Sequence, residues 1–93
     1  MKPKGSPKKN LFKERMRELS EEALYPSGFD DAIIGITYRH PDGHIFLMSS
    51  KKIIDILVAQ GMSHSEATEY FEFNMKNAYL GAGSPVYLED EDE

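Results

Sequence analysis

GMSHSEATEYFEFNMKNAYLGAGSPVYL, residues 61–88, is the stretch of sequence that decides the fold of this chain. Ser63 is followed three residues later by Glu66, which is the spacing of a capping box. In this motif the serine oxygen accepts a hydrogen bond from the glutamate backbone, and the glutamate carboxylate accepts one from the serine backbone. Glycine at position 81 favours the end of a helix, because it adopts a left-handed conformation without strain. The sequence therefore predicts a capped helix over residues 64–80.

The predicted helix carries an apolar stripe wide enough to face a hydrophobic core. At about 100° per residue, six side chains fall within about 80° of one direction: Ala67, Tyr70, Phe71, Asn74, Met75 and Ala78. A buried amide without a partner costs about 1–3 kcal/mol, so we expect Asn74 to hydrogen-bond the glycine exit or a neighbouring strand. Phe73 and Leu80 lie on the opposite flank, so the helix is either covered on two sides or exposes an apolar pair.

The residues around this helix predict a small antiparallel sheet and two further helices. After a capping Asn10, the side chains of Phe12, Met16 and Leu19 follow one another on one helical face. Branched and aromatic residues fill the segment 31–39, and a Pro-Asp-Gly turn then reverses the chain. The predicted fold is therefore α+β, with the sheet packed against the helices. Its elements are helices over 10–24, 50–60 and 64–80, a hairpin over 31–48 and a short C-terminal strand over 85–88.

The chain is predicted to be one domain with a tail at each end. Residues 1–9, MKPKGSPKK, combine two prolines and a glycine with lysines, so we expect a disordered basic tail. Residues 89–93, EDEDE, repel one another, so we expect an acidic frayed tail. Residues 10–88 form the single α+β domain. Its core is small, and its stability is expected to be modest unless a partner contributes buried area.

The composition excludes several classes of protein. The chain has 93 residues and is 40% hydrophobic, which is typical of a globular protein. The absence of cysteine excludes disulfides, thiolate catalysis and cysteine-bound zinc, and it fits a reducing cytosol. No apolar run approaches the roughly 20 residues needed to span a bilayer. The N-terminal lysines have no apolar signal core behind them. We therefore expect a cytoplasmic protein that does not associate with a membrane.

The net charge of −5 hides a strong asymmetry. Residues 1–17 carry seven cations and one acid, whereas residues 18–93 carry four cations and fifteen acids. A basic arm on an acidic body is typical of a solvated tail, but it can also bind nucleic acid, its own domain or an acidic partner. The residues that would contact nucleic acid are Lys8, Lys9, Lys13, Arg15 and Arg17.

Five stretches of the sequence resemble a group of small, mostly uncharacterised proteins of tailed-bacteriophage genomes and prophage regions. These stretches are IIGI at 33–36, a helix containing ILV that ends in GMS at 61–63, EATEYFEFN at 66–74, AYLGAGSP at 78–85 and VYL at 86–88. The resemblance covers residues 29–88, and its specific part is EYFEFN with the following AYLGAGSP. It implies a phage or prophage origin, and hence the cytoplasm of a bacterial host. It implies no activity and no functional residue.

Three segments of the sequence contain residue types that are used in metal binding, acid–base catalysis or anion binding. His40, Asp42 and His44 surround one turn, but a hairpin tip collects exposed polar residues, and the spacing implies no fourth zinc ligand. Three glutamates recur at every third position of the 64–80 helix, which is typical of a solvated face rather than of an acid–base pair. The glycine-rich segment 81–84 follows a helix, so it lacks the positive helix end that binds anions. We therefore predict no catalytic residue, metal site or cofactor.

The remaining hypothesis is binding through a surface. We expect a non-catalytic interaction protein that binds a host protein or a second copy of itself, for example as an inhibitor or modulator of a host factor. Candidate partner-binding residues are Glu69, Glu72, Phe73 and Leu80, and the polar residues with structural roles are Asn74, Ser63 and Glu66. The alternative is a nucleic-acid-binding accessory protein that uses the basic arm. The acidic body and the absence of a basic patch interleaved with aromatic residues disfavour this alternative.

Overall fold

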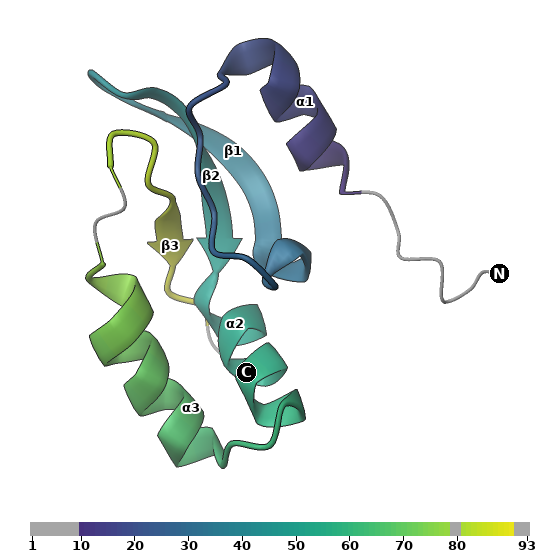
Figure 1. Cartoon of the computed structure of the whole chain (residues 1–93), viewed down its shortest axis with the longest axis vertical. Helices are drawn as coiled ribbons and strands as arrows, with labels where there is room; N and C mark the ends of the chain where they lie inside the picture. The colour runs from purple at the N-terminus through teal and green to yellow at the C-terminus, as the bar shows by residue number, and fades with distance from the viewer. Residues whose placement is uncertain (1–9, 79–80, 91–93) are drawn as a thin grey trace, which may run out of the picture.

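The computed structural model describes residues 10–78 and 81–90. Its elements are α1 (Leu11–Leu19), β1 (Ile33–Arg39), β2 (Gly43–Ser49), α2 (Ser50–Ala59), α3 (His64–Tyr70) and β3 (Val86–Leu88). A short 3-10 helix, η1 (Asp30–Ala32), precedes β1, and a π-helical segment, η2 (Phe71–Lys76), continues α3. The predicted α+β class is confirmed, with the three helices beside a three-stranded sheet (Figure 1).

The sheet has the order β1-β2-β3 and is mixed. β1 and β2 form the predicted antiparallel hairpin, but β3 pairs parallel to β2, with Val86 opposite Leu47, so the prediction of a wholly antiparallel sheet is wrong in this detail. The chain reverses twice between β2 and β3, and two reversals restore the original direction. α2 continues away from the end of β2, α3 returns beside it, and the turn after residue 80 reverses the chain again (Figure 1). Gly61 and Gly81, both with positive φ, lie at these two reversals.

The first helix is shorter than predicted. α1 ends at Leu19, and Ser20 is already extended, although the apolar spacing predicted helix as far as residue 24. The backbone N–H of Leu24 instead donates to the Gly83 carbonyl at 2.9 Å. A Cβ on Gly83 would lie 1.8 Å from the Glu22 carbonyl oxygen, so only glycine fits against this segment. A tertiary backbone contact therefore replaces the last helical turn.

The hairpin tip is fastened to the turn before β3 by one arginine. The Arg39 guanidinium donates through Nε to the Asp42 carboxylate at 2.8 Å and through Nη2 to the Ser84 carbonyl at 3.0 Å. The Ser84 hydroxyl in turn donates to the Gly81 carbonyl at 2.8 Å. The predicted turn over 40–44 is thus confirmed, and Asp42 is used within it as an ion-pair partner.

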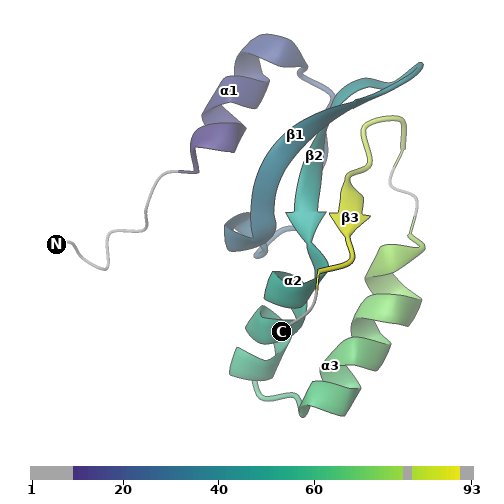
Figure 2. The ribbon, with the colours of Figure 1, turned by 180° about the vertical axis from the view of Figure 1, so that it is seen from behind.

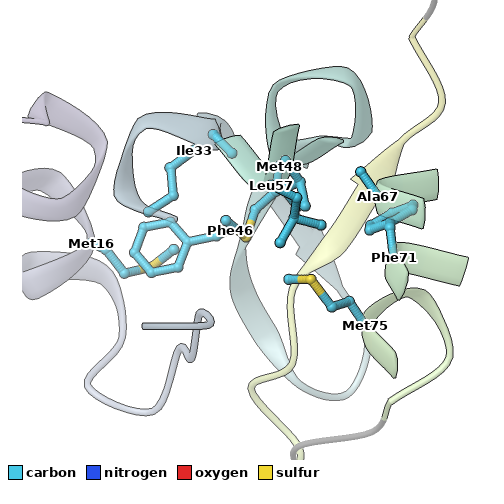
Figure 3. Close-up of a cluster of buried hydrophobic side chains, with 10 residues drawn as sticks. Met16, Ile33, Phe46, Met48, Leu57, Ala67, Phe71 and Met75 are labelled. Atoms are coloured by element: carbon cyan, nitrogen blue, oxygen red, sulfur yellow. The ribbon is translucent and has the colours of Figure 1, made fainter. Parts of the chain in front are cut away.

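One hydrophobic core joins the helices to the sheet. Figure 3 shows buried side chains that run from α1 across β2 to α2 and α3: Met16, Ile33, Phe46, Met48, Leu57, Ala67, Phe71 and Met75. Two edge-to-face ring pairs extend this core, Tyr25 against Phe46 with centroids 5.6 Å apart and Phe71 against Tyr87 at 5.2 Å. The second pair ties β3 to η2, and it thereby fixes the position of the residues that follow β3.

Candidate functional site

The helix predicted by the capping box begins where the motif places it. The Ser63 hydroxyl accepts from the Glu66 backbone N–H at 3.1 Å, and the Glu66 carboxylate accepts from the Ser63 N–H at 2.9 Å. Both predicted structural roles are therefore observed, and together they set the rotation of α3 about its axis.

The face that this helix buries is narrower than predicted. Ala67, Phe71 and Met75 are buried at four-residue spacing, whereas Tyr70 and Asn74, both assigned to the apolar stripe, are exposed. From Phe71 onward the chain is π-helical, with hydrogen bonds that span five residues, so each residue advances by less than the usual rotation. Residues four positions apart, here Ala67, Phe71 and Met75, then stay on the buried side of the helix. Asn74 is exposed, so the expectation of a buried amide that must bond the glycine exit or a neighbouring strand is wrong in its premise.

The opposite side of α3 and η2 presents exposed aromatic rings. The side chain of Phe73 is 79% exposed and that of Tyr70 is 42% exposed, whereas Phe71 between them is 2% exposed. Glu69 is exposed on the same helix, four residues before Phe73, which is the spacing of neighbours on a helix surface. We call Glu69, Tyr70 and Phe73 the aromatic flank.

The other predicted partner-binding residues are placed differently. Leu80 lies outside the described residues. Glu72 lies 3.8 Å from the Lys76 amine and lines a groove between α2 and α3, so it belongs to that groove rather than to the aromatic flank. Sequence reasoning missed Tyr70 because an α-helical period places it in the core. The only sequence signal for its exposure was its three-residue spacing from Phe73.

Of the basic residues proposed for nucleic-acid binding, Lys13, Arg15 and Arg17 lie on α1. Lys8 and Lys9 lie outside the described residues. Lys13 pairs with the Asp30 carboxylate and lies 5.0 Å above the Tyr25 ring. The hydrogen bond to Asp30, and then that to Tyr25, raises the pKa of the Lys13 amine. Arg15 and Arg17 are exposed on α1. Lys13 is therefore committed to holding α1 against its own domain.

A groove of about 530 Å³ separates α2 from α3, and sequence reasoning did not foresee it. Its apolar wall is formed by Ile54 and Phe71. Its polar lining comes from both helices and from the chain after β3: Ser50, Lys51, Asp55, His64, Thr68, Glu72, Lys76, Glu89 and Asp90. The two helices lie side by side below the sheet, and the chain after β3 reaches the start of α2 (Figure 2).

The first two residues of the segment predicted to fray are held in this groove. The Asp90 carboxylate accepts hydrogen bonds from the Lys51 backbone N–H at 2.9 Å and from the Ser49 hydroxyl. Burial alone raises the pKa of the Asp90 carboxyl, but these hydrogen bonds outweigh burial and hold the pKa below its usual value. The Glu89 carboxylate pairs with the Lys76 amine. Charge attraction within the fold thus overcomes the repulsion expected between neighbouring acids.

Two of the three turn residues considered as zinc ligands, Asp42 and His44, make other contacts. Asp42 pairs with Arg39, and the His44 ring packs edge-on against Tyr38 with centroids 5.3 Å apart. Within residues 10–78 and 81–90, no group of three or more histidine, aspartate or glutamate side chains is placed to hold a metal ion. In the same part of the chain, no helix is long and apolar enough to cross a membrane.

Comparison with known proteins found no match to a protein-family model, to a curated protein or to a solved structure.

Proposed function

We propose that this chain is a non-catalytic interaction protein that docks its aromatic flank into an apolar pocket of a protein partner. The exposure of Phe73 carries the proposal, because a ring that is 79% exposed gains nothing from folding and retains its apolar area for a partner. Aromatic side chains of this kind are enriched among the residues that dominate binding energy at interfaces. Tyr70, three residues earlier and 42% exposed, adds further apolar surface and a hydroxyl on the same helix.

The charge around the flank favours a partner with basic residues. Glu69 lies beside Phe73, and residues 18–93 carry fifteen acids against four cations. A partner pocket rimmed by lysine or arginine would therefore meet complementary charge. A two-fold homodimer through this surface would instead place Glu69 close to its own copy, and like charges disfavour that contact. The resemblance of residues 29–88 to phage and prophage proteins supports a bacterial host protein as the partner, with inhibition or modulation of that protein as the outcome.

The proposal is tested with matched variants of the full chain. Proteins retained from bacterial lysate would be compared among the unchanged chain, Phe73→Ala and Val58→Ala, which removes a partly exposed apolar side chain from α2. A retained protein is then purified and its affinity measured by calorimetry. We expect Phe73→Ala to weaken binding at least about 30-fold, as at a hot spot, and Val58→Ala to leave it within about threefold. Equal retention and equal affinity for both variants would refute the proposal.

Self-association is resolved by light scattering of the same variants. A dimer that forms with rising concentration and is lost in Phe73→Ala would replace the host partner with a second copy of this chain. A monomer at all concentrations leaves the host partner as the occupant.

Nucleic-acid binding through the basic arm remains the alternative, and the pairing of Lys13 with Asp30 weakens it. A filter-binding assay at low salt, with and without residues 1–17, distinguishes the two functions. Equal retention of nucleic acid by both forms excludes the arm, whereas retention that depends on the arm and falls steeply with salt would favour the alternative.

A further inference from the structure

The N-terminus of α2 is built to hold a negatively charged group. Ser49 caps this ten-residue helix, and its hydroxyl accepts from the Lys52 backbone N–H at 3.0 Å while donating to Asp90. The Lys51 N–H donates to the same carboxylate at 2.9 Å. The first N–H groups of a helix and the positive end of its dipole favour an anion at this position. The position accepts a carboxylate, since Asp90 supplies one.

A buried hydroxyl beside this position is left without a partner. Ser50 is 7% exposed and lines the groove, and its Oγ has no hydrogen-bond partner among the described residues. Buried hydroxyls in folded proteins nearly always have a partner, so an orphaned one marks a place where another group belongs. The next residue along, Lys51, is the one that holds Asp90. Ser50, Lys51 and Asp90 all line this groove, so the orphaned hydroxyl and the anion position belong to one site.

The charges in the groove are unbalanced while the chain after β3 occupies it. Two lysines, Lys51 and Lys76, face four carboxylates there. Two of these carboxylates come from the helices, Asp55 and Glu72, and two from the chain after β3, Glu89 and Asp90. Without Glu89 and Asp90 the two lysines would balance the two helical acids, and the positive end of α2 would remain. An anionic ligand with one negative charge that displaced Asp90 alone would therefore leave the charge of the groove unchanged.

From these contacts we propose that the groove between α2 and α3 binds a small anionic ligand, a carboxylate or phosphate monoester with an apolar body, which displaces Asp90 from the N-terminus of α2. The anion meets the Lys51 N–H and the Ser49 hydroxyl. The Ser50 hydroxyl gains its partner from the ligand, and the apolar body lies on Phe71 and Ile54.

A volume of about 530 Å³ falls within the range of about 300–1,000 Å³ typical of small-molecule sites. Asp90 acts as the internal competitor. This site is separate from the aromatic flank, so its test does not depend on whether the proposed protein partner exists.

The test is a titration of the ¹⁵N-labelled full chain followed by NMR, with phenyl phosphate and benzoate as probes and sodium chloride as the ionic-strength control. We expect saturable shifts of the Ser50 and Lys51 amides with at least one probe and none with chloride. The probe that binds more tightly assigns the anion as a phosphate or a carboxylate. If neither probe gives a saturable shift in the unchanged chain or in Asp90→Asn, the proposal is overturned.

Three variants separate the competitor from a general charge effect. Asp90→Asn should lower the dissociation constant about tenfold, because the internal competitor no longer occupies the site. Asp55→Asn removes a groove carboxylate of the same charge that pairs with the Lys51 side-chain amine at 3.0 Å but does not contact the backbone N–H groups of the helix N-terminus, and it should change the constant by less than about threefold. Equal constants in the unchanged chain and Asp90→Asn, or equal effects of the two aspartate variants, would overturn the proposal. Ser50→Ala should raise the constant at least about threefold. The Ser50→Ala variant tests the proposal even if Asp90→Asn does not fold, because an unchanged dissociation constant in Ser50→Ala would also refute the proposed site.

Discussion

Replacing Gly83 with alanine should destabilise the fold strongly, although the change adds only one methyl group. The added Cβ would lie 1.8 Å from the Glu22 carbonyl oxygen, 2.7 Å from its carbonyl carbon and 3.1 Å from the Ala23 Cα. These are backbone atoms, so no side-chain rotation relieves the overlap, and the segment before Leu24 must move away. Such overpacking costs about 1–3 kcal/mol. The same movement weakens the hydrogen bond from Leu24 to the Gly83 carbonyl, which adds about 0.5–1.5 kcal/mol.

One term opposes this loss, because alanine restricts the unfolded chain and recovers about 0.4–1 kcal/mol. The net expectation is a free energy of unfolding lower by about 0.5–4 kcal/mol, with a central value of about 2 kcal/mol, against a total of about 5–15 kcal/mol typical of a domain. At a slope of about 1–2 kcal/mol/M, this central value lowers the urea midpoint, followed by circular dichroism, by about 1–2 M. Gly35→Ala is the control, since its Cβ would lie 3.5 Å from the Leu47 side chain in ordinary contact. Equal midpoints for the two variants would refute the reasoning.

Three further predictions follow from the groove and from the two faces of η2. Ser50→Ala should raise the free energy of unfolding by about 1 kcal/mol in urea titrations, because it removes an orphaned buried hydroxyl from a helix; a loss of stability would mean that the hydroxyl has a partner. Phe71→Ala should cost about 3–5 kcal/mol and Phe73→Ala less than about 0.5 kcal/mol in the same assay, and similar losses would contradict the assigned rotation of the helix. The pKa of Asp90 is held below 3.8, so its contribution to stability is complete above that pH and is lost as the pH falls through the lower folded value. The Lys51 amide shift should therefore titrate with a midpoint below 3.8, and a midpoint at or above it would show that the carboxylate is not held.

The sequence predicts those parts of the fold that depend on short-range chemistry. The capping box of Ser63 and Glu66 and the turn that follows Arg39 are each determined within a few residues, and both are present. The direction of β3 depends instead on two reversals far apart in the chain, so its three residues carry no sign of parallel pairing. The end of α1 has the same explanation. Its last predicted turn is lost to a contact with residue 83, which no local pattern reveals.

The candidate sites divide in the same way. The exposure of Phe73 follows from any helical period, so the sequence identifies it, whereas Asn74 is misassigned because the period changes within the helix. Tyr70 precedes that change and lies at the margin of the predicted stripe. The groove depends on Asp90 reaching a helix that begins forty residues earlier at Ser50. A run of acids read alone predicts repulsion. Only the fold brings the first two acids of that run, Glu89 and Asp90, to their partners on η2 and α2.

The way in which β3 is held has a consequence for the assembly of the protein. Three residues form a short ladder, and polar anchors flank it, with Arg39 on the Ser84 carbonyl before the strand and Asp90 on α2 after it. If both anchors were released together, β2 would become an edge strand with unpaired N–H and C=O groups, which is the surface on which chains add strands to one another. By pairing with β2, β3 therefore keeps the central strand from being an edge strand. The two anchors thus keep this edge of β2 paired as well as stabilising the monomer.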